Sequence, residues 1–528
     1  MINQTYEMCK SFLFPLLSLI SRSYKIFDFK EIFTSDKTKE LIISLLKDKM
    51  NISLLKDKKI ELNNNNYIIV VNIMNHIIDN NAEIVNNIRE IYSIAPANKL
   101  RDLIAKHFIP TNDEKKQYAE VPTPVKLVDE MLNTIPVDFW KTPQKVFEPC
   151  CGKGNFVLGI FDRFYKGLEE MYPDEIERCR IIMTQCIYYA DLTALNGFIT
   201  TEIMKCHVQS YCGLDEFDFE FKNYTGDTLK LNIEDNWNIL LEDVSIIGNP
   251  PYSTDPSKPN TKPLYDKFIE KYIGGNLLLF VVPSRWFIGG KGLDGFRDFM
   301  MKRKDIVFIQ HEDDATKWFG NNVEIKGGVN YFLKDTLYDG VCLFNDVQYD
   351  LSKYDCIVKP KYHKVIDIVI NMESINKLYM GRYFGIETND KRFKDNGKFK
   401  CYVSTFKSKD RCKYIDEYNF NENNTFWKVI TAEAAFGAFS GFSTKFIGNP
   451  NEVHTGSYIS FRVNNEEEAK SLLSYLDTKF ANHMLSVRKI SQHINGDVCK
   501  WIPLVPLDRT WSDDKVFEYL KIEQTMYI

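Results

Sequence analysis

Short apolar runs alternate with helical stretches between about residues 118 and 335 of the chain. This alternation is typical of a doubly wound α/β sheet with helices on its faces. Ligands of such sheets lie outside the carboxyl ends of the strands, so the residues that directly follow each strand are the first candidates for a functional site. The expected strands are Lys145–Glu148, Cys186–Ala190, Val244–Gly248, Leu277–Val282 and Ile306–Gln310.

The regions on either side of this alternation differ from it. Residues 1–115 are rich in Lys, Asn and Ile, and their apolar residues at helical spacing predict a helical accessory region without evident chemistry. Within it, Phe12–Ile20 lacks the flanks and cleavage site of a signal peptide, so we expect a helix that buries its apolar face. The apolar residues that carry the helical spacing in residues 1–115 are Leu41, Leu45, Ile84, Ile88 and Ile91. Beyond about residue 340 the composition changes again.

Composition excludes several classes of protein. Of the 528 residues, 44% are hydrophobic and 26% are charged, which excludes a wholly disordered chain, a collagen-like fibre and a disulfide mini-scaffold. No run reaches the ~18 apolar residues of a membrane span. The 12 cysteines are scattered without a CxxC pair. We therefore expect a cytoplasmic or other reduced compartment, no secretion and no membrane partner.

The net charge of -5 conceals a strongly basic segment. Between residues 353 and 413, fifteen Lys and Arg residues outnumber seven Asp and Glu residues, which gives a local excess of +8. Tyr and Phe residues are interleaved with these cations. Because cations meet phosphates and aromatic rings stack on bases, the segment favours a polyanion as its partner. A solvated basic surface without a partner is an equally open interpretation.

A glycine turn follows the first expected strand. The strand ends at Glu148, Gly152 and Gly154 form a tight turn, and a helical pattern begins near Phe156. Glycines let backbone amides approach a ligand, and the positive start of the helix attracts a carboxylate. The charge of Glu148 would repel phosphates, which argues against a pyrophosphate site. It can instead pair with a cationic group, such as the amino group or sulfonium of S-adenosylmethionine.

A second motif, Asn249–Tyr252, directly follows the apolar strand Val244–Gly248. Pro250 and Pro251 fix φ and remove two backbone donors. The polar groups that remain are acceptors, namely the side-chain oxygen of Asn249 and the carbonyl of Pro250, and an exocyclic amine needs such acceptors. Tyr252 supplies a ring face on which a planar substrate can stack. A simple turn is the alternative, and the glycine turn about 95 residues earlier argues against it.

The two motifs resemble motifs I and IV of amino-group methyltransferases that use S-adenosylmethionine. Glu120–Pro124 and the apolar residues after it are similar to motif X, which contributes to the cofactor pocket in that family. Asp191 ends the second strand, where the family keeps an acid for the ribose hydroxyls. Asp227 stands where the acid of motif III faces the cofactor adenine. The order of these motifs, followed by a C-terminal recognition region, resembles the γ arrangement of DNA adenine methyltransferases of type II restriction-modification systems.

Further segments extend the resemblance to roughly residues 100–528. It implies a Rossmann-like methyltransferase sheet over residues 116–340, a mixed α+β target-recognition domain over 341–528 and a helical accessory region over 1–115. The additional segments are Pro283–Trp286, Gly289–Asp294, Val323–Val329, Tyr475–Phe480, Arg488–Gln492, Trp501–Pro503 and Trp511–Asp513.

The resemblance implies transfer of a methyl group from S-adenosylmethionine to N6 of an adenine that is flipped out of double-stranded DNA, without a metal. Such methylation protects DNA in a restriction-modification system. Methylation of cytosine N4 and a catalytically silent DNA-binding subunit are the alternatives. A restriction nuclease is expected to be a separate chain, because the nuclease-like pattern lies inside a methylase block. That pattern consists of Asp313, Asp314, Glu324 and Lys326.

Three sets of site residues follow. The catalytic candidates are Asn249, Pro250, Pro251 and Tyr252. The candidates for binding S-adenosylmethionine are Thr123, Pro124, Glu148, Pro149, Cys150, Gly152, Gly154, Phe156, Asp191, Asp227 and Asn249. The candidates for binding DNA are Arg382, Lys391, Arg392, Arg488 and Lys489.

Overall fold

The computed structural model describes residues 12–53, 67–108, 122–214, 216–254, 261–320, 325, 327–403, 412–418, 425–434, 441–489 and 492–523. The chain divides into two compact units. Unit 1 comprises Met1–Val282, Lys304–Val323 and Asn330–Gly340. Unit 2 comprises Pro283–Arg303, Glu324–Val329 and Val341–Ile528.

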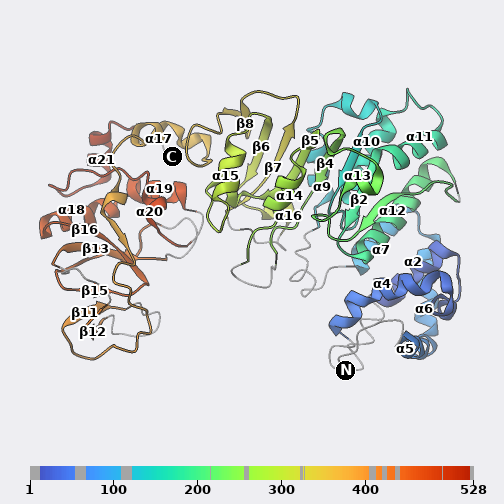
Figure 1. Cartoon of the computed structure of the whole chain (residues 1–528), viewed down its shortest axis with the longest axis horizontal. Coiled ribbons are helices and arrows are strands. Elements are labelled where there is room, and N and C mark those ends of the chain that lie inside the picture. The colour runs from blue at the N-terminus through green and yellow to red at the C-terminus, as the bar shows by residue number, and fades with distance from the viewer. Residues whose placement is uncertain are drawn as a thin grey trace. The chain divides into compact units, whose positions relative to one another are not determined.

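The N-terminal part of unit 1 is helical, as its sequence predicts. The apolar segment near the N-terminus is a helix with a buried face, in which Phe14 and Ile20 are fully buried. Arg22 holds this helix by donating to the carbonyls of Tyr92 and Ala95, both at 2.8 Å. Helix α7 lies beside α12 of the same unit (Figure 1). The helices are α2 (Phe14–Tyr24), α3 (Phe29–Thr34), α4 (Asp36–Ser53), α5 (Tyr67–Asp79), α6 (Ala82–Ile94) and α7 (Ala97–His107).

The strands of unit 1 follow the order β3-β2-β1-β4-β5-β7-β6. The pairs β1/β2, β1/β4, β2/β3 and β4/β5 are parallel. The strands β2, β4 and β5 are buried along their whole length, as expected of a sheet covered on both faces. The strands are β1 (Lys145–Glu148), β2 (Ile187–Asp191), β3 (Lys222–Thr225), β4 (Val244–Gly248), β5 (Leu277–Pro283), β6 (Ile306–Glu312) and β7 (Val329–Asp335).

This large, mostly parallel sheet with its helices confirms the predicted α/β fold class. The bounds of β1 and β4 agree with the sequence expectation, and β2, β5 and β6 differ from it by one or two residues at their ends. Strands β3 and β7 were not among the expected strands. The sequence of β3, KNYT, has no apolar run, and β3 lies at the end of the strand order.

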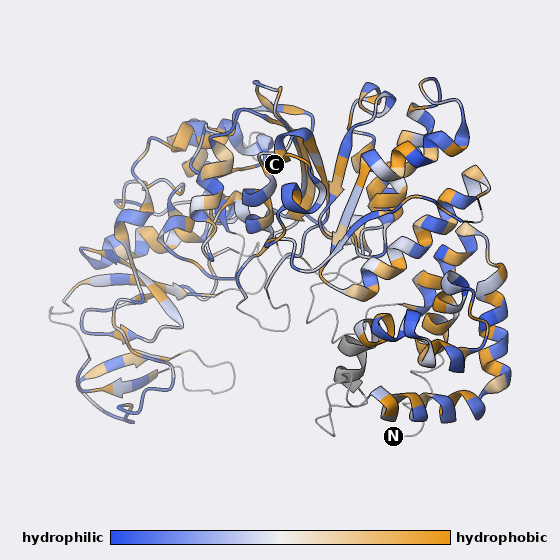
Figure 2. Ribbon diagram, turned by 45° about the vertical axis from the view of Figure 1, so that its right-hand side comes forward, coloured by the Kyte–Doolittle hydropathy of each residue, from blue (hydrophilic) through white to orange (hydrophobic). Residues whose placement is uncertain are grey.

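Several helices of unit 1 carry apolar residues on one side and polar residues on the other, and apolar and polar residues alternate along the helices in Figure 2. Asp174 and Thr193 cap two of these helices by accepting hydrogen bonds from the backbone amides of Glu177 and Asn196. The helices are α9 (Val125–Leu132), α10 (Asn155–Gly167), α11 (Glu175–Ile181), α12 (Ala194–Cys212), α13 (Ile233–Trp237), α14 (Tyr265–Tyr272) and α16 (Thr316–Phe319). Shorter turns are η3 (Val137–Lys141), η4 (Ile182–Cys186) and η5 (Leu241–Asp243).

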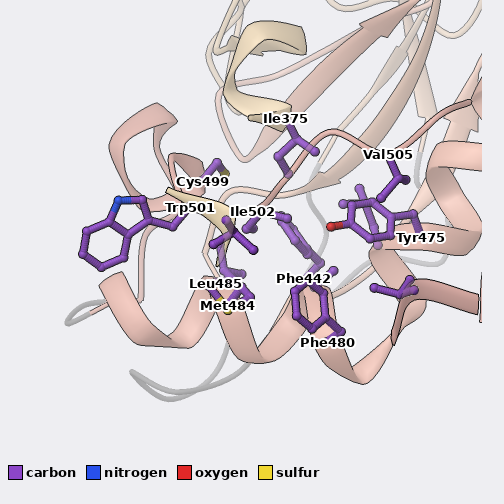
Figure 3. Packing of buried hydrophobic residues seen from close by; sticks show 14 of the residues in the cluster. Ile375, Phe442, Tyr475, Phe480, Met484, Leu485, Cys499, Trp501, Ile502 and Val505 are labelled. Carbon is purple, nitrogen blue, oxygen red and sulfur yellow. The ribbon is translucent and has the colours of Figure 1, made fainter. Parts of the chain in front are cut away.

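Unit 2 mixes strands and helices. A four-stranded sheet has the order β10-β16-β13-β14, and a three-stranded sheet has the order β12-β11-β15. Its core includes Tyr475, Phe480, Met484 and Trp501, which pack closely in Figure 3. The strands are β8 (Cys342–Phe344), β9 (Val347–Tyr349), β10 (Tyr379–Gly381), β11 (Phe399–Tyr402), β12 (Cys412–Ile415), β13 (Trp427–Ala432), β14 (Phe446–Gly448), β15 (Val453–His454) and β16 (Tyr458–Val463). The helices are α15 (Asp294–Met301), α17 (His363–Val369), α18 (Glu466–Asp477), α19 (Lys479–Arg488), α20 (Gly496–Cys499) and α21 (Asp513–Leu520), with turns η6 (Ser284–Phe287), η7 (Pro360–Tyr362) and η8 (Ile375–Leu378).

Within the described part of the chain, no helix combines the length and the apolar character that crossing a membrane requires.

Candidate active site

Four polar side chains lie at the carboxyl ends of four neighbouring strands in unit 1. Glu148 ends β1, Asp191 ends β2, Asp227 follows β3 by two residues, and Asn249 directly follows β4. The registers align these ends, because Glu148 pairs with Tyr189 of β2 and Asp191 pairs with Thr225 of β3. Parallel strands present their carboxyl ends at one edge, so these side chains share the edge at which α/β sheets bind ligands.

The glycine loop after β1 is held by backbone and side-chain hydrogen bonds. The amide of Cys151 donates to the carbonyl of Ala190 at 2.8 Å, and the amide of Gly152 donates to Oδ2 of Asp191 at 3.0 Å. Thr200 Oγ1 donates to the carbonyl of Gly152 at 3.0 Å. These contacts fix the loop against β2 and α12.

Two glycines of this loop adopt positive φ angles, +53° for Gly152 and +82° for Gly154. A Cβ atom on Gly154 would lie 2.9 Å from Cγ2 of Thr200, so this position has no room for a side chain. A Cβ atom on Gly152 would meet nothing within 4 Å. The loop is therefore packed against α12 at Gly154 and open at Gly152, where a ligand can approach the backbone.

Asp191 is buried and serves the fold of the loop. Its Oδ1 accepts hydrogen bonds from the amide of Thr193 at 2.9 Å, from the hydroxyl of the same residue at 3.0 Å and from Nδ2 of Asn196 at 3.2 Å. Its Oδ2 accepts the amide of Gly152. Burial raises the pKa of Asp191, and these hydrogen bonds oppose the rise.

Glu148 is equally buried but has far fewer partners. The residue is 3% exposed. Burial, reinforced by the charge of Asp191, raises the pKa of Glu148 well above its usual range, and only the backbone amide of Val157 opposes this shift. Its Oε2 is buried and has no hydrogen-bond partner among the described residues. A carboxylate in this state gains from a cation that approaches it.

Asn249–Tyr252 leaves β4 next to Glu148. A Cβ atom on Gly248 would lie 3.4 Å from Cγ of Glu148. Nδ2 of Asn249 donates to Oγ1 of Thr123 at 3.0 Å. Burial raises the pKa of Tyr252, so its phenol stays neutral at physiological pH. The carbonyl of Tyr252 accepts the amide of Leu264 at 3.3 Å, which ties the end of the motif to the chain before α14.

Thr123 joins the glycine loop to Asn249. The residue is 6% exposed, and its carbonyl accepts a hydrogen bond from Nδ2 of Asn155, the first residue of α10, at 2.8 Å. Pro124 directly precedes α9. The first two residues of the motif-X segment, 120 and 121, lie outside the described residues. Asn155 was not among the expected site residues, because no spacing rule connects it with residue 123.

The remaining expected cofactor residues have diverse surroundings. Asp227 is half-buried, and its Oδ1 accepts the amide of Leu229 at 3.1 Å. Burial raises the pKa of the Cys150 thiol well above its usual value. Pro149 is buried, and Phe156 is buried on α10 with 2% exposure.

Lys271 of α14 was also missed by the sequence argument. Its Nζ donates to the carbonyls of Thr228, Leu229 and Leu231 at 2.9, 2.8 and 2.6 Å. Burial lowers the pKa of Lys271. This lysine holds the loop that follows Asp227, and a lone lysine in an amphipathic helix gives no signal of that role.

The five candidate DNA-binding residues fall into two groups within unit 2. Arg382 and Lys391 are exposed, and Arg382 pairs with Glu433 at 3.0 Å. Arg392 is half-buried and forms a bidentate pair with Asp390. The other two candidates lie in the interior of the unit.

Arg488 and Lys489 are only 4% and 1% exposed. Arg488 pairs with Asp355 at 2.6 Å, and its guanidinium carbon lies 4.3 Å from the ring centroid of Trp501. The expectation for these two residues therefore has to be revised, because buried side chains that pack unit 2 offer no surface to DNA. The sequence alone could not predict this burial, because Arg488 pairs with Asp355, which is 133 residues away along the chain.

The charge excess of the segment 353–413 is partly neutralised in the folded chain. Acids inside the segment and beyond it pair with its cations. The described ion pairs are Lys353–Asp367, Lys377–Glu373, Arg382–Glu433, Arg392–Asp390, Lys394–Asp416, Lys400–Glu452 and Lys413–Asp395. The acids that lie outside the segment, and that the count of +8 does not include, are Glu433, Asp416 and Glu452; in the opposite sense, Asp355 of the segment pairs with Arg488 and Lys500 from outside it.

The nuclease-like pattern gains no support from the described residues. His311 lies 3.1 Å from Asp313, and Asp314 caps a turn by accepting from Thr316. Residues 324 and 326 lie outside the described ranges. Across those ranges, no group of three or more His, Cys, Asp or Glu side chains is placed to hold a metal ion.

Comparisons with known proteins point to one kind of enzyme. The Eco57I restriction-modification methylase family matches residues 243–319, which include Asn249–Tyr252. An uncharacterized adenine-specific methylase of Mycoplasma pneumoniae is 25% identical over 324 residues, which are 48% of this chain and 76% of that protein.

Solved structures resemble the chain at low sequence identity. The ATP-dependent type ISP restriction-modification enzyme LlaBIII bound to DNA has a TM-score of 0.52 at 10% identity, over 98% of this chain and 45% of that chain. A DrdV–DNA complex has a TM-score of 0.49 at 14% identity, over 91% of this chain and 66% of that chain. The chain thus spans less than two thirds of these proteins. The Asn249–Tyr252 motif at the sheet edge lies in the part of the chain that is similar to restriction-modification methylases, and the chain is similar over 324 residues to an adenine-specific methylase.

Proposed function

We propose that this chain transfers a methyl group from S-adenosylmethionine to N6 of an adenine flipped out of double-stranded DNA. The observation that carries the proposal is the position of Asn249, next to Gly248 and the buried Glu148, at the carboxyl edge of the sheet. An acceptor amide for an exocyclic amine and a carboxylate suited to a cation are thereby neighbours.

The residues at this edge fit S-adenosylmethionine. Glu148 Oε2 is buried without a hydrogen-bond partner among the described residues, and Gly152 is open where a side chain would obstruct a ligand. Glu148 would pair with the amino group, and the loop amides at the start of α10 would receive the carboxylate. Asp191 Oδ2, which accepts one described hydrogen bond, retains capacity for a ribose hydroxyl. When bound, the cofactor supplies a methyl group activated by its sulfonium.

Asn249 and Pro250 would act on the amine of the target base. Oδ1 of Asn249 and the carbonyl of Pro250 each accept one N–H, which raises the electron density on N6. Because Pro250 and Pro251 lack N–H groups, these two positions offer no backbone donor to compete for these acceptors. Catalysis on this scheme consists of positioning and electrostatics, with no covalent link between enzyme and base.

Tyr252 would stabilise the flipped base. Extracting an adenine from a duplex costs a few kcal/mol, and stacking on an aromatic ring returns about 1–3 kcal/mol per base. The phenol of Tyr252 is uncharged at neutral pH, and burial raises its pKa further, so the ring carries no charge that would repel DNA phosphates. Cofactor, amine and ring would therefore meet at the edge formed by β1 and β4.

The DNA duplex would be recognised by the region 341–528, with residues 116–340 as the catalytic domain and 1–115 as the helical accessory region. Exposed cations such as Lys391 and Arg382 support contacts to phosphate or base edges. We further propose that the methylation protects DNA from a restriction endonuclease encoded by a separate chain.

The test is modification-sensitive sequencing of a genome exposed to the enzyme. Methylated adenines in one sequence motif are expected with the wild-type chain and none with Asn249→Ala, which should still bind the cofactor. Asn223→Ala, on the exposed face of β3, is the matched control and should methylate normally. Methylcytosine instead of methyladenine, or full methylation by Asn249→Ala, would contradict the proposal.

A further inference from the structure

One chain of hydrogen bonds connects the glycine loop with the acceptor amide. Asn155 directly follows Gly154, and its Nδ2 donates to the carbonyl of Thr123 at 2.8 Å. The hydroxyl of Thr123 accepts a hydrogen bond from Nδ2 of Asn249 at 3.0 Å. The three residues come from segments that are 32 and 126 residues apart, so only the fold brings them together.

The second of these bonds holds the Asn249 amide in place. Oγ1 of Thr123 accepts from Nδ2 at 3.0 Å, so Oδ1 lies at the opposite end of the amide group. A threonine hydroxyl can also donate, so this bond anchors the amide and does not by itself select its oxygen over its nitrogen. The proposed reaction needs an acceptor toward N6, and an amide that left this place would not present one there.

The first bond fixes the position of Thr123 itself. Thr123 lies directly before Pro124, whose ring restricts the backbone of the preceding residue. Its carbonyl is held by Asn155 at the start of α10, and its side chain is buried. The hydroxyl therefore has a defined place relative to the glycine loop.

We propose that Thr123 and Asn155 are positioning residues that hold the amide of Asn249 in the place from which it faces the target amine. The inference rests on the proposed function of Asn249 and extends it, because it couples the loop expected to bind the cofactor to the acceptor of the substrate amine. Thr123 then acts on catalysis through Asn249, whatever contact it also makes with the cofactor.

The experiment compares Thr123→Val, Thr123→Ser and Asn155→Ala with the wild-type enzyme. Valine keeps the shape of threonine but cannot accept a hydrogen bond, whereas serine can. Thr134→Val is the matched control, because the hydroxyl of Thr134 donates to the carbonyl of Met131 at 2.6 Å at the end of α9. For each variant, the single-turnover rate of methyl transfer at saturating cofactor and DNA, the Kd of the cofactor and the melting temperature are measured.

Thr123→Val should lower the transfer rate about 10- to 100-fold, the loss expected from a misplaced reactive geometry, with a much smaller change in cofactor Kd. Asn155→Ala should lower it in the same direction, and Thr123→Ser should recover most of the rate. Thr134→Val should transfer at the wild-type rate. If Thr123→Val does not fold, Asn155→Ala still tests the same chain of hydrogen bonds against the wild type, and the reverse holds if Asn155→Ala does not fold.

Two results would overturn the inference. One is a Thr123→Val enzyme that binds cofactor weakly but transfers at the wild-type rate once saturated, since Thr123 would then serve only the cofactor. The other is an equal loss in Thr123→Val and Thr123→Ser, which would indicate packing. A wild-type enzyme without any transfer to adenine would instead refute the proposed function, and the inference with it.

Discussion

Replacing Glu148 by Gln should weaken cofactor binding and, at the same time, stabilise the protein without its cofactor. Glu148 is buried, and the charge of Asp191 adds to the cost of ionising it. The ionised side chain is therefore costly in the empty site and useful only when a cation is bound. Glutamine removes the charge and keeps the shape.

The loss of affinity can be estimated from the bond that disappears. A hydrogen bond to a charged group contributes about 1.5–3 kcal/mol, and about 1.4 kcal/mol corresponds to a factor of ten. The Kd of S-adenosylmethionine should therefore rise on the order of 10- to 100-fold in Glu148→Gln. 5′-Methylthioadenosine lacks the amino group of the methionine part of the cofactor, so it should bind the variant and the wild type equally.

The pH dependence has a definite sign. The pKa of Glu148 is raised in the folded protein, so the native chain binds more protons than the unfolded chain above the ordinary glutamate pKa near 4.5. Its contribution to stability is complete below that value and is lost as pH rises through the folded pKa, at most about 1.4 kcal/mol per pH unit. Glu148→Gln should abolish this loss and melt at a higher temperature than the wild type at neutral pH.

Cofactor affinity should follow the opposite course in the wild type. Binding of the cationic amino group favours ionised Glu148, so affinity should increase with pH until this carboxyl has lost its proton or the amino group of the ligand, with an ordinary pKa of about 7.7–8.0, begins to lose its own. Below that point the slope is at most about tenfold per pH unit for one coupled proton. Glu148→Gln should show a flatter profile.

Isothermal titration between pH 6 and 9, with melting curves of the cofactor-free protein, measures both effects. Glu202→Gln is the matched control, because Glu202 is another carboxylate of low exposure in unit 1 and pairs with Lys205 on α12. A Glu148→Gln variant with the wild-type Kd and the wild-type pH slope would refute the assignment of this carboxylate to the cofactor.

Four further outcomes test other features of the chain. Gly154→Ala should lower the melting temperature more than a typical surface substitution, because its Cβ would lie 2.9 Å from Thr200 and φ is +82°. Lys391→Ala should reduce the salt dependence of DNA binding by about one unit of the logarithmic slope. Arg488→Met should destabilise unit 2 by less than the ~3–5 kcal/mol of a fully buried pair, because Asp355 is partly exposed and keeps its pair with Lys500. Burial lowers the pKa of Lys428 to about 7, so stability should rise between pH 7 and 10.5, and Lys428→Met should flatten that rise in urea titrations.

The sequence predicted the part of the site that depends on neighbouring strands. Glu148, Asp191 and Asn249 each stand at the end of an apolar run, and parallel pairing brings such ends together without further information. Strand β3 was not predicted, because its side chains alternate between partly buried and exposed positions and its sequence contains no apolar run.

Contacts between distant segments could not be predicted in the same way. The bond from Asn249 to Thr123 and the pair of Arg488 with Asp355 depend on how segments pack after each has formed. The basic segment illustrates the same point, because Glu433 and Glu452 neutralise two of its cations from outside the residues that a local charge count includes.

The two buried acids at adjacent strand ends should respond in opposite ways to the same substitution. Burial raises the pKa of both Asp191 and Glu148, so the loss of charge alone would favour both amides. The donors around them differ, since four hydrogen bonds converge on Asp191, on both of its oxygens, while Oε2 of Glu148 receives none from the described residues. In Asp191→Asn the new NH2 group must face a donor, at about 1–3 kcal/mol for each one left unsatisfied. Asp191→Asn should therefore have a lower melting temperature than the wild type, and Glu148→Gln a higher one. If both melting temperatures shifted in the same direction, the number of hydrogen-bond donors around each carboxylate would not explain why Asp191 holds the loop while Glu148 is left for the ligand.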